Sequence, residues 1–272
     1  MKYSFVCPAP CNYEIMVDAK NVDEAVVEMI KEGAVHSKTV HPDAPQMTVE
    51  QLANMVRSGT IKAQATARWF VGAALAFWLV LVFLLAQKGA FVRPQQALPF
   101  PILLGVTVPL VVFLAAYLGS DAFRALTLSA DLRLLTAIQA WRAGGLGFLA
   151  LYAHGILPGL FAWPAGLGDI AIGITAPWVM LAVIRQPGFM ASRLFVVWNL
   201  LGILDLVVAV GTGALSSGFV AGLAGAVTTA PMARLPLVLI PAYFVPLFIM
   251  FHLTALFQAR RTLLPETKPL GL

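Results

Sequence analysis

Acidic residues are scarce over most of this 272-residue chain. Of its 13 Asp and Glu residues, eight lie within residues 1–60 and five are spread over the 212 residues that follow. Charged residues make up 11% of the chain and hydrophobic residues 60%, and the mean hydropathy is +0.84. These values exclude an ordinary soluble globular protein over most of the length. We therefore expect a small polar domain, residues 1–60, followed by a membrane domain.

The chain also lacks the motifs that identify several common classes of protein. It contains no P-loop, Rossmann turn, nucleophile elbow or HExxH sequence. The net charge of +5 does not indicate nucleic-acid binding, because the basic residues gather at the ends of hydrophobic runs. Residues 1–20 hold no apolar run long enough for a cleavable signal peptide, so the polar domain is expected to stay in the cytoplasm.

Cysteine occurs only twice, as Cys7 and Cys11, and both lie in the polar domain. They flank a proline-containing turn of a predicted β-hairpin, while His36 and His41 follow at the end of a helix predicted to begin at Asn21. The C-x3-C and H-x4-H spacings are typical of zinc ligands, and a domain this small gains needed stability from a metal. We expect these four side chains to bind one structural zinc ion. The alternative is a surface cysteine pair with two solvated histidines.

The stretch CNYEIMVDAKNVDEAV, followed by HSKTVHP, resembles a small prokaryotic Cys/His domain family of unknown function. The resemblance covers residues 1–60, and it implies a zinc-finger-like α+β fold without a particular activity. The two cysteines are closer together here than in that family. A capping box at residues 48–51 predicts a second short helix that ends near Arg57, before Ser58 and Gly59.

Hydrophobic runs of about 20 residues, the length that crosses a bilayer, fill the rest of the chain. We predict a mostly α-helical fold, a six-helix transmembrane bundle over residues 61–262, with a cytoplasmic tail at residues 263–272. Residues 120–142 are expected to lie as an amphipathic segment on the membrane surface. Residues 213–233 are predicted to be a re-entrant or surface segment, with a seventh span as the alternative. The predicted spans are 68–87, 100–118, 142–162, 167–185, 193–212 and 235–258.

Three further stretches, FAWPAGLGD, WNLLGILDL and LPLVLIPAYFVPLF, are similar to uncharacterised bacterial integral membrane proteins. This resemblance covers residues 130–260 and implies a bacterial inner membrane, with no activity attached. The expected surroundings are therefore the lipid bilayer, and an oligomer is compatible with the sequence.

Basic residues predict the orientation of the bundle. With the N-terminus inside, eleven of them fall on the cytoplasmic side and three on the opposite side. We therefore predict that both termini are cytoplasmic. The eleven are Arg57, Lys62, Arg68, Arg124, Arg133, Arg142, Arg185, Arg193, Arg260, Arg261 and Lys268, and the three are Lys88, Arg93 and Arg234.

Five polar side chains fall inside the predicted spans, where ionisable groups are costly and are candidates for function. They are His154, Asp205, Asp169, Asn199 and His252. At 1.5 Å per residue His154 and Asp205 lie equally deep, roughly 16 Å from the inner end, and we expect them to face each other as the central site. The other three would extend a polar column. Their alternatives are a helix cap for Asp169, an interhelical hydrogen bond for Asn199 and an interfacial position for His252.

A polar column inside a bundle whose third and last spans contain prolines favours a carrier or binder of a small solute or ion, coupled to protons. The alternatives are a membrane sensor with a cytoplasmic zinc module and a membrane-embedded, metal-dependent enzyme. A haem protein is disfavoured, because His154 and His252 differ in depth by roughly 8 Å. Close helix approach is predicted at Gly144, Gly145 and Gly147. The sequence does not identify the ligand.

Overall fold

The structure of the chain is a computed structural model that is mostly helical. It divides into two compact units, Met1–Ala76 and Phe77–Leu272. The residues that it describes are 2–6, 11, 13–19, 22–40, 49–94, 97–186, 188–220 and 225–263.

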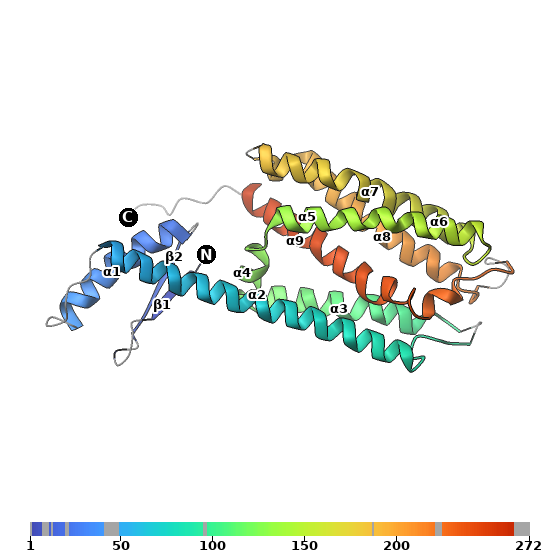
Figure 1. Ribbon diagram of the computed structural model, residues 1–272, viewed down its shortest axis with the longest axis horizontal. Helices are drawn as coiled ribbons and strands as arrows, with labels where there is room; N and C mark the ends of the chain where they lie inside the picture. Colours follow the sequence, from blue (N-terminus) through green and yellow to red (C-terminus); the bar gives the residue numbers. More distant parts are fainter. Residues whose placement is uncertain are drawn as a thin grey trace. The chain divides into compact units, whose positions relative to one another are not determined.

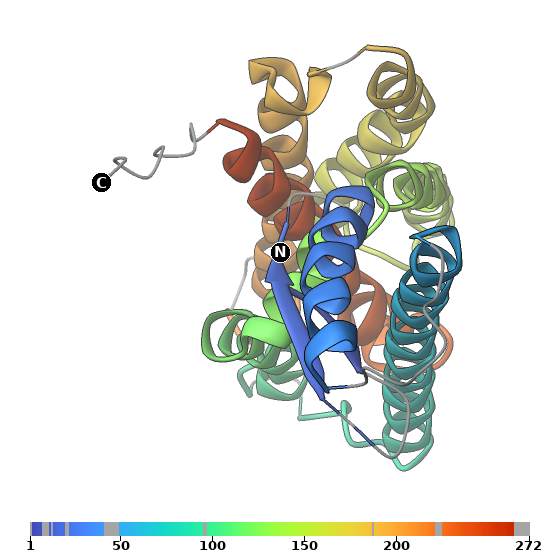
Figure 2. The ribbon, with the colours of Figure 1, turned by 90° about the vertical axis from the view of Figure 1, so that its left-hand side faces the viewer.

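The first unit contains a hairpin of β1 (Lys2–Val6) and β2 (Glu14–Asp18), followed by α1 (Val22–Val40) (Figure 2). The strands pair antiparallel, with Lys2 opposite Asp18. Alternate residues of β2 face α1, since successive side chains of a strand point to opposite faces. The predicted hairpin and helix are thus confirmed. Their buried core consists of Ile15, Val17, Ala19, Ala25, Val26 and Met29.

Helix α2 (Val49–Gln87) starts where the capping box predicted a helix, but it does not end near Arg57. The predicted end at Ser58 and Gly59 is wrong. Gly and Ser are only weak helix breakers, and the next proline in the sequence is Pro94, so the helix continues through them. The apolar part of α2, Trp69–Gln87, is long enough to cross a membrane.

Six helices of the described chain are long and apolar enough to span a membrane, in agreement with the predicted number. The third span joins three consecutive elements, of which Figure 1 labels α5 and α6. The last span begins with a π-helical turn. After α2, the spans are α3 (Phe100–Gly119); α5 (Leu132–Ile138), η1 (Gln139–Gly145) and α6 (Leu146–Ala153); α7 (Gly159–Arg185); α8 (Arg193–Leu215); and η4 (Ile240–Phe244) with α9 (Val245–Leu263).

The third span begins about ten residues earlier than predicted, because Arg142 lies in its middle rather than at its start. Only α4 (Asp121–Leu128) remains as a short amphipathic helix before it. Asp131 then caps α5, where its side chain accepts a hydrogen bond of 2.9 Å from the backbone N–H of Arg133. The Arg133 side chain also bonds Asp131 and holds the pKa of that carboxyl below its usual value.

Helix α7 packs closely against both η1 and α8, and α8 packs against α9 (Figure 1). The contact of α7 with η1 requires Gly173, since a Cβ there would lie 2.7 Å from the carbonyl carbon of Arg142. Of the three glycines predicted to permit close approach, Gly145 does so, against the Asp169 side chain. A Cβ at Gly144 or Gly147 would meet no atom within 4 Å.

The described part of residues 213–233 contains the end of α8 and η3 (Ala230–Ala233), and no helix long enough to span a membrane. The described residues thus contain six candidate spans. Moving Arg142 into the bundle changes the predicted basic count from eleven to ten against three. The orientation with both termini inside stays a prediction.

Candidate functional site

Arg142 lies in the middle of the third span and is buried, with 2% of its surface exposed. It belongs to η1, a 3₁₀ segment between two α-helical pieces. Such a segment inside a helix often marks a functional position, because it changes the direction of the side chains that follow. An arginine at this depth requires partners, since a buried unpaired charge is very costly.

Three other spans supply those partners. The Arg142 Nε donates to Asp169 Oδ1 of α7 at 2.7 Å, and Nη2 pairs with Asp205 Oδ2 of α8. Nη1 donates to the carbonyl oxygen of Gly202 at 3.2 Å and lies 3.1 Å from His252 Nε2 of α9. The guanidinium therefore connects spans three to six at one level.

Asn199 completes the arrangement and fixes the proton of His252. The Asn199 amide nitrogen donates to the carbonyl oxygen of Phe195 at 2.9 Å, which leaves Oδ1 as an acceptor for His252 Nδ1, also at 2.9 Å. His252 Nε2 must accept from Arg142, because a guanidinium only donates. The hydrogen-bond network thus assigns the proton of His252 to Nδ1. We call Arg142, Asp169, Asn199, Asp205 and His252 the buried cluster.

The indole ring of Trp198 packs against His252. Trp198 packs edge-on against the His252 ring, with 5.4 Å between ring centroids, and its Nε1 donates to Thr175 Oγ1 of α7 at 2.9 Å. The Thr175 hydroxyl is itself anchored to the Ala171 carbonyl at 2.7 Å. These contacts tie α7, α8 and α9 together around the imidazole, and they leave it little freedom to turn.

The buried cluster contains more negative than positive charge when both carboxylates are ionised. Arg142 contributes one positive charge against one negative charge each from Asp169 and Asp205, a sum of −1. Both carboxyl groups contact the same guanidinium. A proton or a cation placed beside them would balance the charge, and burial makes that balance energetically important.

The same geometry argues against a metal centre in this cluster. The Arg142 guanidinium occupies the space between the two carboxylates that a shared metal ion would need. Both ring nitrogens of His252 are already hydrogen bonded, so neither is available as a ligand. No group of three or more metal-ligating side chains is found within the part of the chain that the structure describes.

Four of the five predicted intramembrane residues come together in the buried cluster, and His154 does not. His154 is exposed and follows α6 at the end of the third span. The predicted pairing of His154 with Asp205 is wrong, because the span starts earlier than predicted and Arg142 takes the place expected for the histidine. Asp169 does not cap a helix, since it lies ten residues inside α7.

Neither Arg142 nor Gln139 was predicted to lie inside the bundle, where both are buried in η1. Residues 134–153 form a 20-residue run in which Arg142 is the one charged residue, and this run would have revealed the span. Gln139 lies one 3₁₀ turn before Arg142 and is 1% exposed. Neither its Oε1 nor its Nε2 has a hydrogen-bond partner in the described structure.

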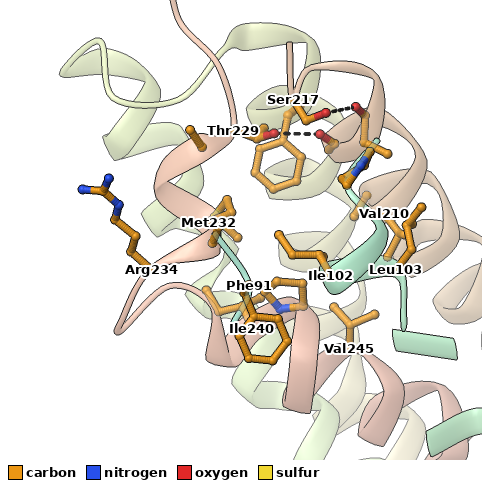
Figure 3. A pocket seen from close by; sticks show the side chains of 18 of the residues that line it. Phe91, Ile102, Leu103, Val210, Ser217, Thr229, Met232, Arg234, Ile240 and Val245 are labelled. Carbon is orange, nitrogen blue, oxygen red and sulfur yellow. Dashed lines mark hydrogen bonds between the residues drawn. The ribbon is translucent and has the colours of Figure 1, made fainter. Parts of the chain in front are cut away.

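Two cavities reach the buried cluster. The end cavity, about 350 Å³, lies between α3, α7, α8 and residues 230–245, and its lining includes Arg93 and Arg234 beside the loops (Figure 3). The side cavity, about 260 Å³, lies between η1 and α6 on one side and η4 and α9 on the other. Five residues line both cavities: Phe148, Asp169, Leu206, Ile240 and Val245.

The predicted zinc ligands are only partly within the described residues, since Cys7 and His41 lie outside them. The other two come together, with Cys11 Sγ 3.4 Å from His36 Nε2. The Tyr13 ring stacks on the His36 ring at a centroid distance of 4.5 Å. A thiol and an imidazole at this separation could share a metal ion after a small adjustment.

Comparison with known proteins gives one match. A family described as a domain of unknown function, DUF8737, matches residues 99–260, which include every member of the buried cluster. No curated protein and no solved structure matches the chain. The resemblance of residues 1–60 to a Cys/His family is not confirmed by these comparisons. Because the match covers more than half of its length, the chain belongs to the DUF8737 family.

Proposed function

We propose that the protein is a multi-pass membrane protein that binds a small solute or ion at the buried cluster and carries it together with a proton or cation. The observation that supports this most directly is the unequal charge: two part-buried carboxylates pair with one guanidinium. We place it in a bacterial inner membrane with both termini cytoplasmic, as the sequence predicts.

A purely structural ion pair would be expected to balance its charges. Burying charge costs more than a well-packed apolar replacement, so an additional carboxylate in the bundle interior calls for a positively charged occupant. Asp169 and Asp205 retain 15% and 11% side-chain exposure, whereas Arg142 retains 1%. The carboxylates, rather than the guanidinium, are therefore the groups that an incoming ligand can contact.

We expect the variant Asp205→Asn to lose ligand binding while it still folds. The change leaves Arg142 paired with Asp169 at 2.7 Å, so the charges balance without a ligand. The measurement is a thermal-unfolding screen of the purified protein against small solutes and ions, because a ligand that binds the folded state raises the midpoint. At least one compound should stabilise the wild type and leave Asp205→Asn unaffected.

Asp121→Asn is the matched control for this experiment. Asp121 makes an exposed ion pair with Arg124 on α4, with 92% of its own side chain exposed. This variant should respond to every stabilising compound as the wild type does. If the stabilising compounds act equally on Asp205→Asn, the buried cluster is not their binding site and the proposal is contradicted.

A structural zinc ion in the first unit is a separate proposal, supported by the 3.4 Å approach of Cys11 and His36. Elemental analysis of the full-length protein should give about one zinc per chain, and the variants Cys11→Ala and His36→Ala should lose it. His154→Ala changes an exposed histidine of the second unit and should keep the zinc. Wild-type protein prepared without a chelator and still free of zinc would contradict the proposal.

A further inference from the structure

Among the residues that the structure describes, Asp169 is the one charged side chain that lines both cavities. Arg142 donates to its Oδ1, and Asp205, the second carboxyl group of the buried cluster, pairs with the same guanidinium. A molecule that fills either cavity therefore meets a carboxylate at its inner end. A positively charged group there would gain a direct ion pair in surroundings where few water molecules compete.

Most of the remaining lining of the end cavity is apolar. Its walls include the aromatic rings of Phe91, Phe148 and Phe161, together with the aliphatic side chains that Figure 3 shows around the empty volume. The two hydroxyls labelled there are already used, since Ser217 donates to the Ala214 carbonyl and Thr229 to the Gly213 carbonyl (Figure 3). Apolar walls cannot replace the water molecules around a small inorganic cation, but they can pack against the hydrocarbon part of an organic ligand. The faces of the aromatic rings also attract organic cations.

The positions of the basic residues favour one route into this site. Arg93 and Arg234 line the end cavity at the loops, and Figure 3 shows the Arg234 guanidinium directed away from the apolar side chains. Two positive charges there oppose the approach of a cation from that end. The side cavity instead lies beside Trp141, which is 81% exposed, and beside the exposed Gly147. Both residues belong to the third span, so this flank faces lipid when the span crosses a membrane.

We propose that the ligand is a small apolar amine in its protonated form. Its ammonium group pairs with Asp169, its hydrocarbon part fills the end cavity, and it arrives from the bilayer through the side cavity. A cavity of about 350 Å³ has the size of small-molecule sites that combine apolar walls with one or two polar anchors. This assignment rests on the proposed function and names the class of ligand.

Three compounds with one shared skeleton test the assignment: 3-phenylpropylamine, 3-phenylpropanol and 3-phenylpropanoate. Titration calorimetry with the purified protein should show binding of the amine, with the alcohol and the acid at least roughly tenfold weaker, since only the amine can pair with a buried carboxylate. Asp169→Asn should weaken amine binding by a similar factor, and Asp121→Asn should leave it unchanged. Alcohol binding as tight as that of the amine, or full amine binding by Asp169→Asn, would overturn the assignment.

The route is tested by narrowing the side cavity with Gly147→Leu in phosphatidylcholine nanodiscs. The matched control is Gly211→Leu on α8, another exposed helical glycine whose Cβ would meet no atom within 4 Å and which lines neither cavity. Amine association should slow severalfold in Gly147→Leu and stay at the wild-type rate in Gly211→Leu. Equal rates in both variants would contradict access from the lipid.

The outcome also separates this inference from the proposed function. An inorganic ion or an uncharged solute that stabilises the wild type but not Asp205→Asn, in the absence of amine binding, would refute the amine and keep the buried cluster as the binding site. If no compound distinguishes Asp205→Asn from the wild type, both proposals fail.

Discussion

Replacing Arg142 with methionine is expected to lower the free energy of unfolding by about 3–5 kcal/mol, the range for removing one partner of a buried ion pair. Methionine keeps the length of the side chain but leaves Asp169 and Asp205 facing each other without a cation. The loss would show as a lower thermal midpoint of the purified protein in detergent and as a smaller yield of folded protein.

Two comparisons make this prediction specific. Lys31→Met removes an exposed ion pair with Glu28 on α1, for which a cost of about 0–1 kcal/mol is usual. The triple variant Arg142→Met, Asp169→Asn, Asp205→Asn removes all three charges and should regain much of the stability that the single variant loses. An Arg142→Met protein as stable as the wild type would mean that the carboxylates do not depend on this guanidinium.

Gly173→Ala is expected to be nearly as damaging, although it adds a single methyl group. The new Cβ would lie 2.7 Å from the carbonyl carbon of Arg142 and 2.9 Å from the Cα of Ala143. These are backbone atoms, so α7 and η1 would have to separate. Overpacking of this kind costs about 1–3 kcal/mol or more. The same separation would pull Arg142 away from Asp169, and ligand binding should fall with stability.

Gly211→Ala should have the opposite effect on stability. A Cβ at this glycine of α8 would meet no atom within 4 Å, and alanine is the better helix former by about 1 kcal/mol. Thermal midpoints of the two variants, measured side by side, should therefore move in opposite directions from the wild type. A Gly173→Ala midpoint equal to that of Gly211→Ala would show that η1 and α7 can move apart without harm.

Several parts of the fold follow from local patterns. Alternation along residues 14–18 and helical spacing at Ala25, Val26 and Met29 predicted the hairpin and first helix, because these periods place side chains on one face. Runs of apolar residues predicted the number of spans, because the length and hydropathy of a run can be read from the sequence without knowledge of its contacts. The sequence also placed Asp169, Asn199, Asp205 and His252 inside the bundle, since few other polar groups occur there.

Other features were decided by contacts between segments that are distant in the chain. Considered alone, Arg142 predicts the end of a span, because an unpaired arginine is unfavourable in hydrocarbon. Its pairing with Asp169, 27 residues away, and with Asp205, 63 residues away, removes that penalty and lets the third span pass through it. This shift moved His154 out of the bundle and replaced it with a guanidinium at the centre of the site. Composition determined that the chain has a membrane bundle with buried polar groups, and only the packing of four spans around one arginine decided which of those groups meet.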